Sequence, residues 1–330
     1  MQFLPKELTD TVTALPSPQG GPERCHQFEA RSITAVNAAL AARRPLLVRG
    51  EPGMGKTQLA EAVAAVLQRA FYPFTVDART ESRDVLWRFD AIMRLAQAQL
   101  YATLHRQPAE VECELALHKF VRPGPLWWAF DTDSALAANG HDATPLEQYD
   151  NASRWKNGWV VLLDEIDKGE TDLPNGLLEA LGAGQFTPLG SDTPVRITGV
   201  PPLILITTNE ERVLPDAFVR RCLVLHLLLP PDEADLVDYL VERGRAHFRG
   251  QTSDDVFREA ARQLVGDRHV AEQAQLRPLP GQAEYLDLVR AVIELAPSDE
   301  KKQTALLAAI APFVLRKSPE GWPASRETPR

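Results

Sequence analysis

Apolar runs of strand length alternate with helix-spaced apolar residues in the first part of the chain. The segment 44–50, "RPLLVRG", predicts a short buried strand, and residues 56–69 space their apolar side chains as an amphipathic helix does. The segment 71–78, "FYPFTVDA", predicts a second strand. A strand, a glycine-rich turn, a helix and a strand in this order form a βαβ unit, which favours a parallel sheet covered by helices.

Similar segments continue to about residue 230. Residues 159–166, "WVVLLDEI", form a nearly continuous apolar run that ends in acids, as expected of a central parallel strand. The later segments predict a short helix over 173–184, a hairpin over 185–197, and two strands over 203–210 and 223–229. The fold class predicted from this order is α/β, with a parallel sheet.

Pro230 and Pro231 mark a change of pattern. After them the strand-like runs stop, and residues 232–316 predict about four helices. The predicted organisation is therefore an N-terminal extension at 1–27, an α/β domain at 28–230, a helical domain at 231–316 and a flexible tail at 317–330.

A long insert, about 84–156, separates the strand at 71–78 from the strand at 159–166. Residues 84–104 predict a helix. Residues 131–152 hold five acidic residues, no Lys or Arg and little periodicity, which predicts a solvated loop. The Pro- and Gly-interrupted extension is predicted to wrap a surface.

Composition narrows the class of protein. The length of 330 residues suggests two domains, and the net charge of −9 argues against a nucleic-acid protein, which usually presents a basic face. The three cysteines are far apart and odd in number, which predicts a reducing cytoplasm rather than a disulfide framework or a metal motif. No apolar stretch reaches the roughly 18 residues of a membrane span, and no signal-peptide pattern begins the chain.

The stretch "GEPGMGKT" has the spacing of a phosphate-binding loop. Its glycines let the backbone approach a ligand closely, and the helix that follows adds positive potential at its N-terminus. Lys56 can reach the β- and γ-phosphates, and the Thr57 hydroxyl can hold Mg²⁺. The alternative is a glycine-rich turn without a ligand. The candidate nucleotide-binding residues are Gly50, Glu51, Pro52, Gly53, Met54, Gly55, Lys56 and Thr57.

Acids and an amide end two of the predicted core strands. Asp164 and Glu165 close one strand, and Asn209 closes another. Since ligands bind at the carboxyl ends of parallel strands, Asp164 is a candidate Mg²⁺ ligand, Glu165 a candidate for polarising water, and Asn209 for orienting that water. Charged or polar residues that merely begin a loop are the alternative, and Thr207 or Thr208 could replace Asn209.

Two arginines, Arg220 and Arg221, precede the last predicted strand. They are either a solvated pair or a finger that reaches the nucleotide of a neighbouring subunit. In well-studied cases such an arginine accelerates turnover by about 10³–10⁵-fold. No histidine pair or nucleophile–histidine arrangement supports a second kind of chemistry.

These motifs, in this order and followed by a helical segment, resemble the AAA+ ATPases. Within them, "FVRPGPLWWAF" at 120–130 and the helix, hairpin and strand over 172–210 are similar to the MoxR family. The resemblance covers about residues 28–316. It implies an AAA+ P-loop NTPase core with a parallel sheet, an insert in the second helix and a hairpin before the first sensor, followed by a C-terminal helical lid.

The resemblance also implies roles. Residues 50–57 would bind ATP, with Thr57 and Asp164 at Mg²⁺ and Glu165 activating water. Asn209 takes the place of the first sensor, and Arg221, with Arg220 as the alternative, that of the finger. The hairpin at 185–197 would move with the nucleotide state. The family further implies ring oligomers, usually hexamers, and co-functioning proteins with von Willebrand A domains.

Two features depart from the family. The acidic segment 131–152 separates the Pro-Gly-Pro from the acidic strand, and the predicted lid helix near residue 282 has no arginine at its start. Arg277 is the nearest candidate for a second sensor.

Three functions follow from these observations. The first is an Mg²⁺-dependent ATPase that remodels or activates a partner protein. The second is a nucleotide-gated switch in a bacterial multi-protein system, with defence as one setting. The third, a DNA-linked motor, is disfavoured by the net charge and by the lack of an aromatic, basic groove. The acid pair favours hydrolysis over a P-loop kinase, and only the resemblance selects ATP over GTP.

Overall fold

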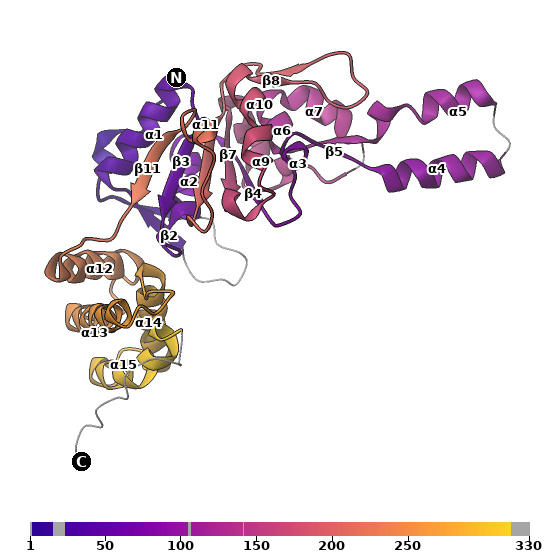
Figure 1. The fold of residues 1–330 in the computed structure, drawn as a ribbon. Coiled ribbons are helices and arrows are strands. Elements are labelled where there is room, and N and C mark those ends of the chain that lie inside the picture. Colours follow the sequence, from indigo (N-terminus) through magenta and orange to yellow (C-terminus); the bar gives the residue numbers. More distant parts are fainter. Residues whose placement is uncertain (1, 16–23, 105–106, 141, 318–330) are drawn as a thin grey trace. The chain divides into compact units, whose positions relative to one another are not determined.

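The computed structural model describes residues 2–15, 24–104, 107–140 and 142–317 (Figure 1). The chain divides into two compact units. The first, here called the sheet unit, comprises 1–9, 28–49 and 57–226; the second, the helical unit, comprises 10–27, 50–56 and 227–330. The predicted tail lies outside the described residues apart from residue 317.

A five-stranded sheet organises the sheet unit, with strand order β11-β3-β10-β7-β4. The pairs β3–β10, β10–β7 and β7–β4 are parallel, as predicted. Non-polar residues fill the central strands because helices cover them. The strands are β3 (Leu46–Gly50), β4 (Ala70–Thr75), β7 (Trp159–Asp164), β10 (Leu203–Thr208) and β11 (Leu223–Leu227).

Helices on the sheet supply the rest of this core. Trp127, Trp128 and Phe130 pack with the β7 and β10 side chains and with Phe218. The two tryptophans are thus core residues, 7% and 1% exposed. The helices outside the insert are α1 (Ala30–Ala42), α2 (Lys56–Val66), α9 (Leu173–Gly176), α10 (Leu178–Ala183) and α11 (Asp216–Val219). The hairpin predicted at 185–197 is confirmed as antiparallel β8 (Gln185–Phe186) and β9 (Val195–Arg196).

The insert between β4 and β7 begins differently from the prediction of one helix over 84–104. A strand, β5 (Trp87–Phe89), interrupts it, because its residues pair antiparallel with β6 (Val121–Pro123). Asp90 then caps the next helix by accepting the Met93 N–H at 2.8 Å. The helix α3 (Ser82–Leu86) precedes β5. The helices α4 (Ala91–Thr103) and α5 (Pro108–Glu114) follow it. Within the sheet unit, α4 and α5 project away from the sheet (Figure 1).

The solvated loop predicted at 131–152 is wrong. Its described residues include α7 (Thr132–Asn139) and α8 (Asn151–Arg154), and α6 (Pro125–Phe130) precedes them. The inward side of α7 carries Thr132, Ala135 and Asn139, which are small or polar, so no apolar periodicity shows. Asn151 is 1% exposed, and its amide bonds both the N–H and the C=O of Phe71 at 2.8 Å.

Four helices form the core of the helical unit, which confirms the prediction for 232–316. Leu240, Leu264 and Tyr285 are each fully buried at the centre of that core. The helices are α12 (Glu233–His247), α13 (Asp254–Gln273), α14 (Gln282–Leu295) and α15 (Glu300–Leu315). Part of the predicted extension forms an antiparallel pair in this unit, β1 (Val12–Leu15) with β2 (Arg24–Gln27).

Throughout the described ranges, every helix is too short or too polar to cross a membrane.

The contact between β2 and α12 makes the helical unit sensitive to acid. Burial, with the nearby Arg243 and His247, lowers the pKa of His26 to about 3. Burial, with Arg243 and Arg290, lowers the pKa of His247 to about 4. Arg243 also donates to the Gln27 carbonyl at 2.9 Å, so a proton on either imidazole faces an anchored cation.

We expect the free energy of unfolding of this unit to fall as the pH drops from about 6.5 toward 4. In that range the two histidines are protonated in the unfolded state and neutral in the folded state. The free energy of unfolding therefore falls by about 1.4 kcal/mol per pH unit for each fully shifted group. Urea melts followed at several pH values measure the slope. His26→Gln should flatten it, whereas His269→Gln, at an exposed position on α13, should not. An equal slope in the His26 variant contradicts the assignment.

Candidate functional site

The loop at residues 50–56 links β3 to α2, and its glycines adopt backbone conformations that other residues disfavour. Gly53 and Gly55 adopt φ values of 79° and 78°, which side chains other than glycine rarely tolerate. Lys56 is 7% exposed, and its Nζ donates to the carbonyl oxygens of Gly50 at 2.6 Å and of Glu51 at 3.0 Å. The lysine therefore folds back over its own loop, and the loop leads directly into Thr57.

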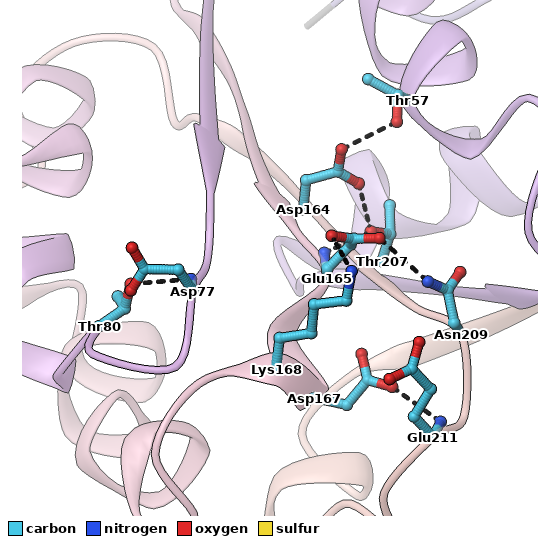
Figure 2. A network of polar contacts seen from close by, with 10 residues as sticks. All are labelled: Thr57, Asp77, Thr80, Asp164, Glu165, Asp167, Lys168, Thr207, Asn209 and Glu211. Atoms are coloured by element: carbon cyan, nitrogen blue, oxygen red, sulfur yellow. Dashed lines mark hydrogen bonds and ion pairs between the residues drawn. The ribbon is translucent and has the colours of Figure 1, made fainter.

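A second cluster lies at the carboxyl edge of the sheet (Figure 2). The Thr57 hydroxyl donates to Asp164 Oδ2 at 2.9 Å, and the Thr207 hydroxyl donates to Asp164 Oδ1 at 2.5 Å. Both oxygens of the Asp164 carboxylate are thereby oriented. The structure thus brings together the two side chains that the sequence offered as Mg²⁺ ligands, one from the start of α2 and one from the end of β7.

Glu165 follows Asp164 and is held from three directions. Its backbone N–H donates to the Thr207 hydroxyl at 2.9 Å. Its side chain accepts from Asn209 Nδ2 at 3.1 Å on Oε1 and from Lys168 Nζ at 2.7 Å on Oε2. The residue adopts φ 61°, in the left-handed region, which is uncommon for a glutamate and frequent at functional sites.

Lys168 was missed from the sequence, although it follows Glu165 by three residues. Its hydrogen bond to Glu165 is the main reason that the Lys168 pKa is raised, with the charges of Glu165, Glu211 and Asp167 adding to the effect. The lysine is therefore a fixed cation against the Glu165 carboxylate. Thr207, named from the sequence only as a substitute for Asn209, is 0% exposed and bridges Asp164 to Glu165.

Two neighbouring acids support the turns of this edge (Figure 2). Asp167 Oδ2 accepts the Glu211 N–H at 2.9 Å and so ties the segment after β7 to the segment after β10. Asp77, just after β4, has its pKa lowered mainly by the Arg79 backbone N–H and next by the Thr80 hydroxyl. These contacts fix the backbones of the loops at this edge.

The donor set fits Mg²⁺ bound with a nucleotide. Mg²⁺ prefers oxygen ligands, usually one or two from the protein, and completes its shell with phosphates and waters. The Asp164 carboxylate and the Thr57 hydroxyl supply such oxygens 2.9 Å apart. Among the described residues no group of three or more His, Cys, Asp or Glu could hold a metal ion by itself.

Arg220 and Arg221 follow α11 and are exposed. A residue missed from the sequence, Arg44, holds their backbone: its guanidinium donates to the carbonyl oxygens of Arg220, of Arg221 at 3.0 Å and of Cys222 at 3.4 Å. Arg221 Nη1 reaches the Ala217 carbonyl at 3.4 Å. Within the described ranges neither Arg220 nor Arg221 forms an ion pair with a carboxylate, so both guanidinium groups remain available to an anion.

Arg277 lies exposed in the segment before α14. The helix itself begins with Gln282 and Ala283 after an N-cap at Gly281, so no arginine stands in its first turn. A different arginine contacts the phosphate-binding loop: Arg268 of α13 bonds both carboxylate oxygens of Glu51. Nothing in the local sequence indicated this pair, which is separated by 217 positions.

Comparison with known proteins identifies the family of the chain. Of the solved structures that match, one is the crystal structure of a candidate ATPase from Cytophaga hutchinsonii ATCC 33406, at 16% identity and TM-score 0.37, over 86% of this chain and 79% of that one. No curated protein matches. The model of the AAA domain (dynein-related subfamily) matches residues 45–222, more than half of the 330 residues. The chain therefore belongs to the AAA domain family, in its dynein-related subfamily.

Proposed function

We propose that the protein is an Mg²⁺-dependent AAA+ ATPase of the MoxR-like type that remodels or activates a partner protein. One observation carries the proposal: at one sheet edge, Asp164 faces Thr57 while Glu165 is held between Asn209 and Lys168. The first pair supplies oxygens for a cation, and the second supplies an oriented carboxylate. These are the parts that hydrolysis of a nucleoside triphosphate requires.

Each residue has a task in this proposal. The loop N–H groups and Lys56 bind the phosphates, and Lys56 exchanges its two loop carbonyls for phosphate oxygens. Mg²⁺, when bound, neutralises charge that develops on the phosphates. Glu165 accepts a proton from the attacking water, and Asn209 orients that carboxylate. The assembly is a ring, with a hexamer as the expected form, and Arg221 or Arg220 completes the site of a neighbouring subunit.

The MoxR-like assignment rests on the Pro-Gly-Pro segment and on the hairpin that precedes β10. Residues 123–125 join the end of the β6 strand to the start of the buried α6 helix, and β8 pairs with β9 before β10, which Asn209 follows. A co-functioning protein with a von Willebrand A domain is the partner that this assignment predicts. Co-purification of the tagged chain with the product of a neighbouring gene, with and without ATP, tests it.

Lys56→Ala tests the grip on phosphate directly. We expect the dissociation constant for a fluorescent ATP analogue to rise by about 100-fold or more, because a charge-assisted contact to phosphate is lost. Fluorescence anisotropy measures it, with unlabelled ATP and GTP as competitors to establish base preference. Lys119→Ala, at a lysine paired with Glu114 in the insert, is the matched control. Wild-type affinity in the Lys56 variant contradicts the proposed function.

A second function, a nucleotide-gated switch, is favoured by one observation. Both carboxylate oxygens of Glu165 accept hydrogen bonds, one from Asn209 and one from Lys168. A site with its general base held in this way would hydrolyse ATP slowly until the contact with Lys168 is broken. A basal rate near zero that a partner protein raises strongly supports the switch over the autonomous ATPase.

A further inference from the structure

Arg268 of α13 contacts the phosphate-binding loop through two hydrogen bonds to Glu51. Its Nη1 and Nη2 donate to the two carboxylate oxygens of Glu51 at 2.9 and 3.0 Å. Nη1 also donates to the Pro280 carbonyl at 3.0 Å, and Nε lies 3.3 Å from Glu272. The Arg268 side chain is 13% exposed. Glu272 of the same helix and the Pro280 carbonyl therefore hold the guanidinium group in addition to its contact with the loop.

A second contact lies beside it on the same loop. A Cβ atom placed on Gly53 would come within 2.6 Å of the Ala283 Cβ, so the first turn of α14 packs directly on the Gly53 backbone. Glu51 and Gly53 flank Pro52, which restricts the chain between them. Residues 51–53 are therefore gripped by α13 on one side and by α14 on the other, all within the helical unit.

The charge of Glu51 gives the arginine contact a consequence. A carboxylate in a loop that binds a triphosphate repels its ligand, since like charges a few ångströms apart interact unfavourably. Arg268 neutralises that carboxylate in a two-bond arrangement, which is the geometry that arginine matches best. It also fixes the direction of Glu51, whose own carbonyl accepts from Lys56.

We propose that Arg268 is a positioning residue for the phosphate-binding loop. It neutralises and orients Glu51, so that the loop receives a triphosphate without repulsion and with its backbone already in place. The inference rests on the proposed function, because it assumes that residues 50–57 bind a nucleotide. Arg268 acts through Glu51 and does not itself touch the reacting atoms.

Arg268→Ala should raise the dissociation constant for the fluorescent ATP analogue by about 10-fold, because an unpaired carboxylate then faces the phosphates. Arg268→Lys, which keeps the charge and loses one of the two bonds, should recover part of the loss. The double variant Arg268→Ala, Glu51→Gln should bind more tightly than Arg268→Ala alone, since it removes the repelling charge. The difference in dissociation constant between Arg268→Ala and the native protein should become smaller in high salt, which screens the repulsion.

Arg262→Ala is the matched control, because Arg262 lies exposed on the same helix. Its sole ion pair among the described residues is a long one, with 4.0 Å between Nη1 and Glu259 Oε2. Hydrogen exchange without nucleotide supplies a second measurement: residues 50–56 should exchange faster in Arg268→Ala. Unchanged affinity in Arg268→Ala overturns the proposal, and so does a double variant no tighter than the single one, which would indicate a merely structural arginine. If Lys56→Ala binds ATP normally, the proposed function is wrong. If Lys56→Ala loses ATP binding and only the Arg268 results differ from those expected, the proposed function stands and the role of Arg268 is wrong.

Discussion

Glu165→Gln should bind ATP with wild-type affinity and lose nearly all turnover. General-base catalysis typically contributes about 10²–10⁴-fold, and the amide cannot accept the proton that the carboxylate takes from water. In the native protein Asn209 and Lys168 donate to the two carboxylate oxygens at 3.1 and 2.7 Å, and the amide, with a single acceptor oxygen, keeps one of these contacts. The change therefore removes proton acceptance while the side chain keeps nearly the same size and shape.

The control for this variant comes from the same sheet edge. The Glu211 backbone N–H donates to Asp167, so Glu211→Gln removes a nearby carboxylate charge without disturbing that bond. Its turnover should stay near that of the native protein. Phosphate release gives the rate, and anisotropy with the fluorescent analogue gives the affinity. Native turnover in Glu165→Gln would show that Glu165 is not the base. The base would then have to be another residue at this edge of the sheet.

Arg221→Ala, or Arg220→Ala if the neighbouring arginine is the finger, should reduce turnover by about 10³-fold or more without weakening ATP binding in proportion. Arg44 holds the carbonyls of both residues, so truncating either side chain leaves the backbone of the segment fixed. Both guanidinium groups are exposed at the end of α11. As the proposed finger, such an exposed arginine would act on a site in another copy of the chain.

Mixing variants tests the inter-subunit arrangement directly. Arg221→Ala subunits keep Glu165, and Glu165→Gln subunits keep Arg221, so a shared site can draw one intact half from each. The mixture should recover part of the lost activity, whereas adding subunits that carry both substitutions should recover none. Light scattering reports the oligomeric state of each sample. A fully active monomer would end the finger hypothesis for both arginines.

The positions of the catalytic candidates follow from local rules. A glycine-rich turn between a strand and a helix predicts an anion-binding loop, because the turn and the helix start are formed by neighbouring residues. Acids and an amide at the ends of apolar runs predict a shared edge, since the carboxyl ends of parallel strands meet there. Thr57, Asp164, Glu165 and Asn209 were predicted in this way. In the structure the Thr57 hydroxyl lies 2.9 Å from Asp164 Oδ2, and Asn209 Nδ2 lies 3.1 Å from Glu165 Oε1.

The insert resisted the same reasoning for a physical reason. The residues that α7 turns inward are a threonine, an alanine and an asparagine, so burial there depends on neighbours from β7 rather than on apolar spacing. Trp159 Nε1 donates to the Thr132 hydroxyl at 2.9 Å, and the Asn151 amide satisfies the backbone of Phe71 on the outer side of β4, at the end of the sheet order. Such polar anchors leave no periodic trace in a sequence.

By itself, then, the sequence determined the parallel sheet, the phosphate-binding loop and the edge at which Asp164, Glu165 and Asn209 gather, because local patterns mark the strands and the carboxyl ends of parallel strands meet at one edge. Only the tertiary structure decided which groups hold those residues. Arg44 meets the carbonyls after α11 and Arg268 meets Glu51 across separations of 177 and 217 positions. A guanidinium group has many possible partners, and only the tertiary packing selects one.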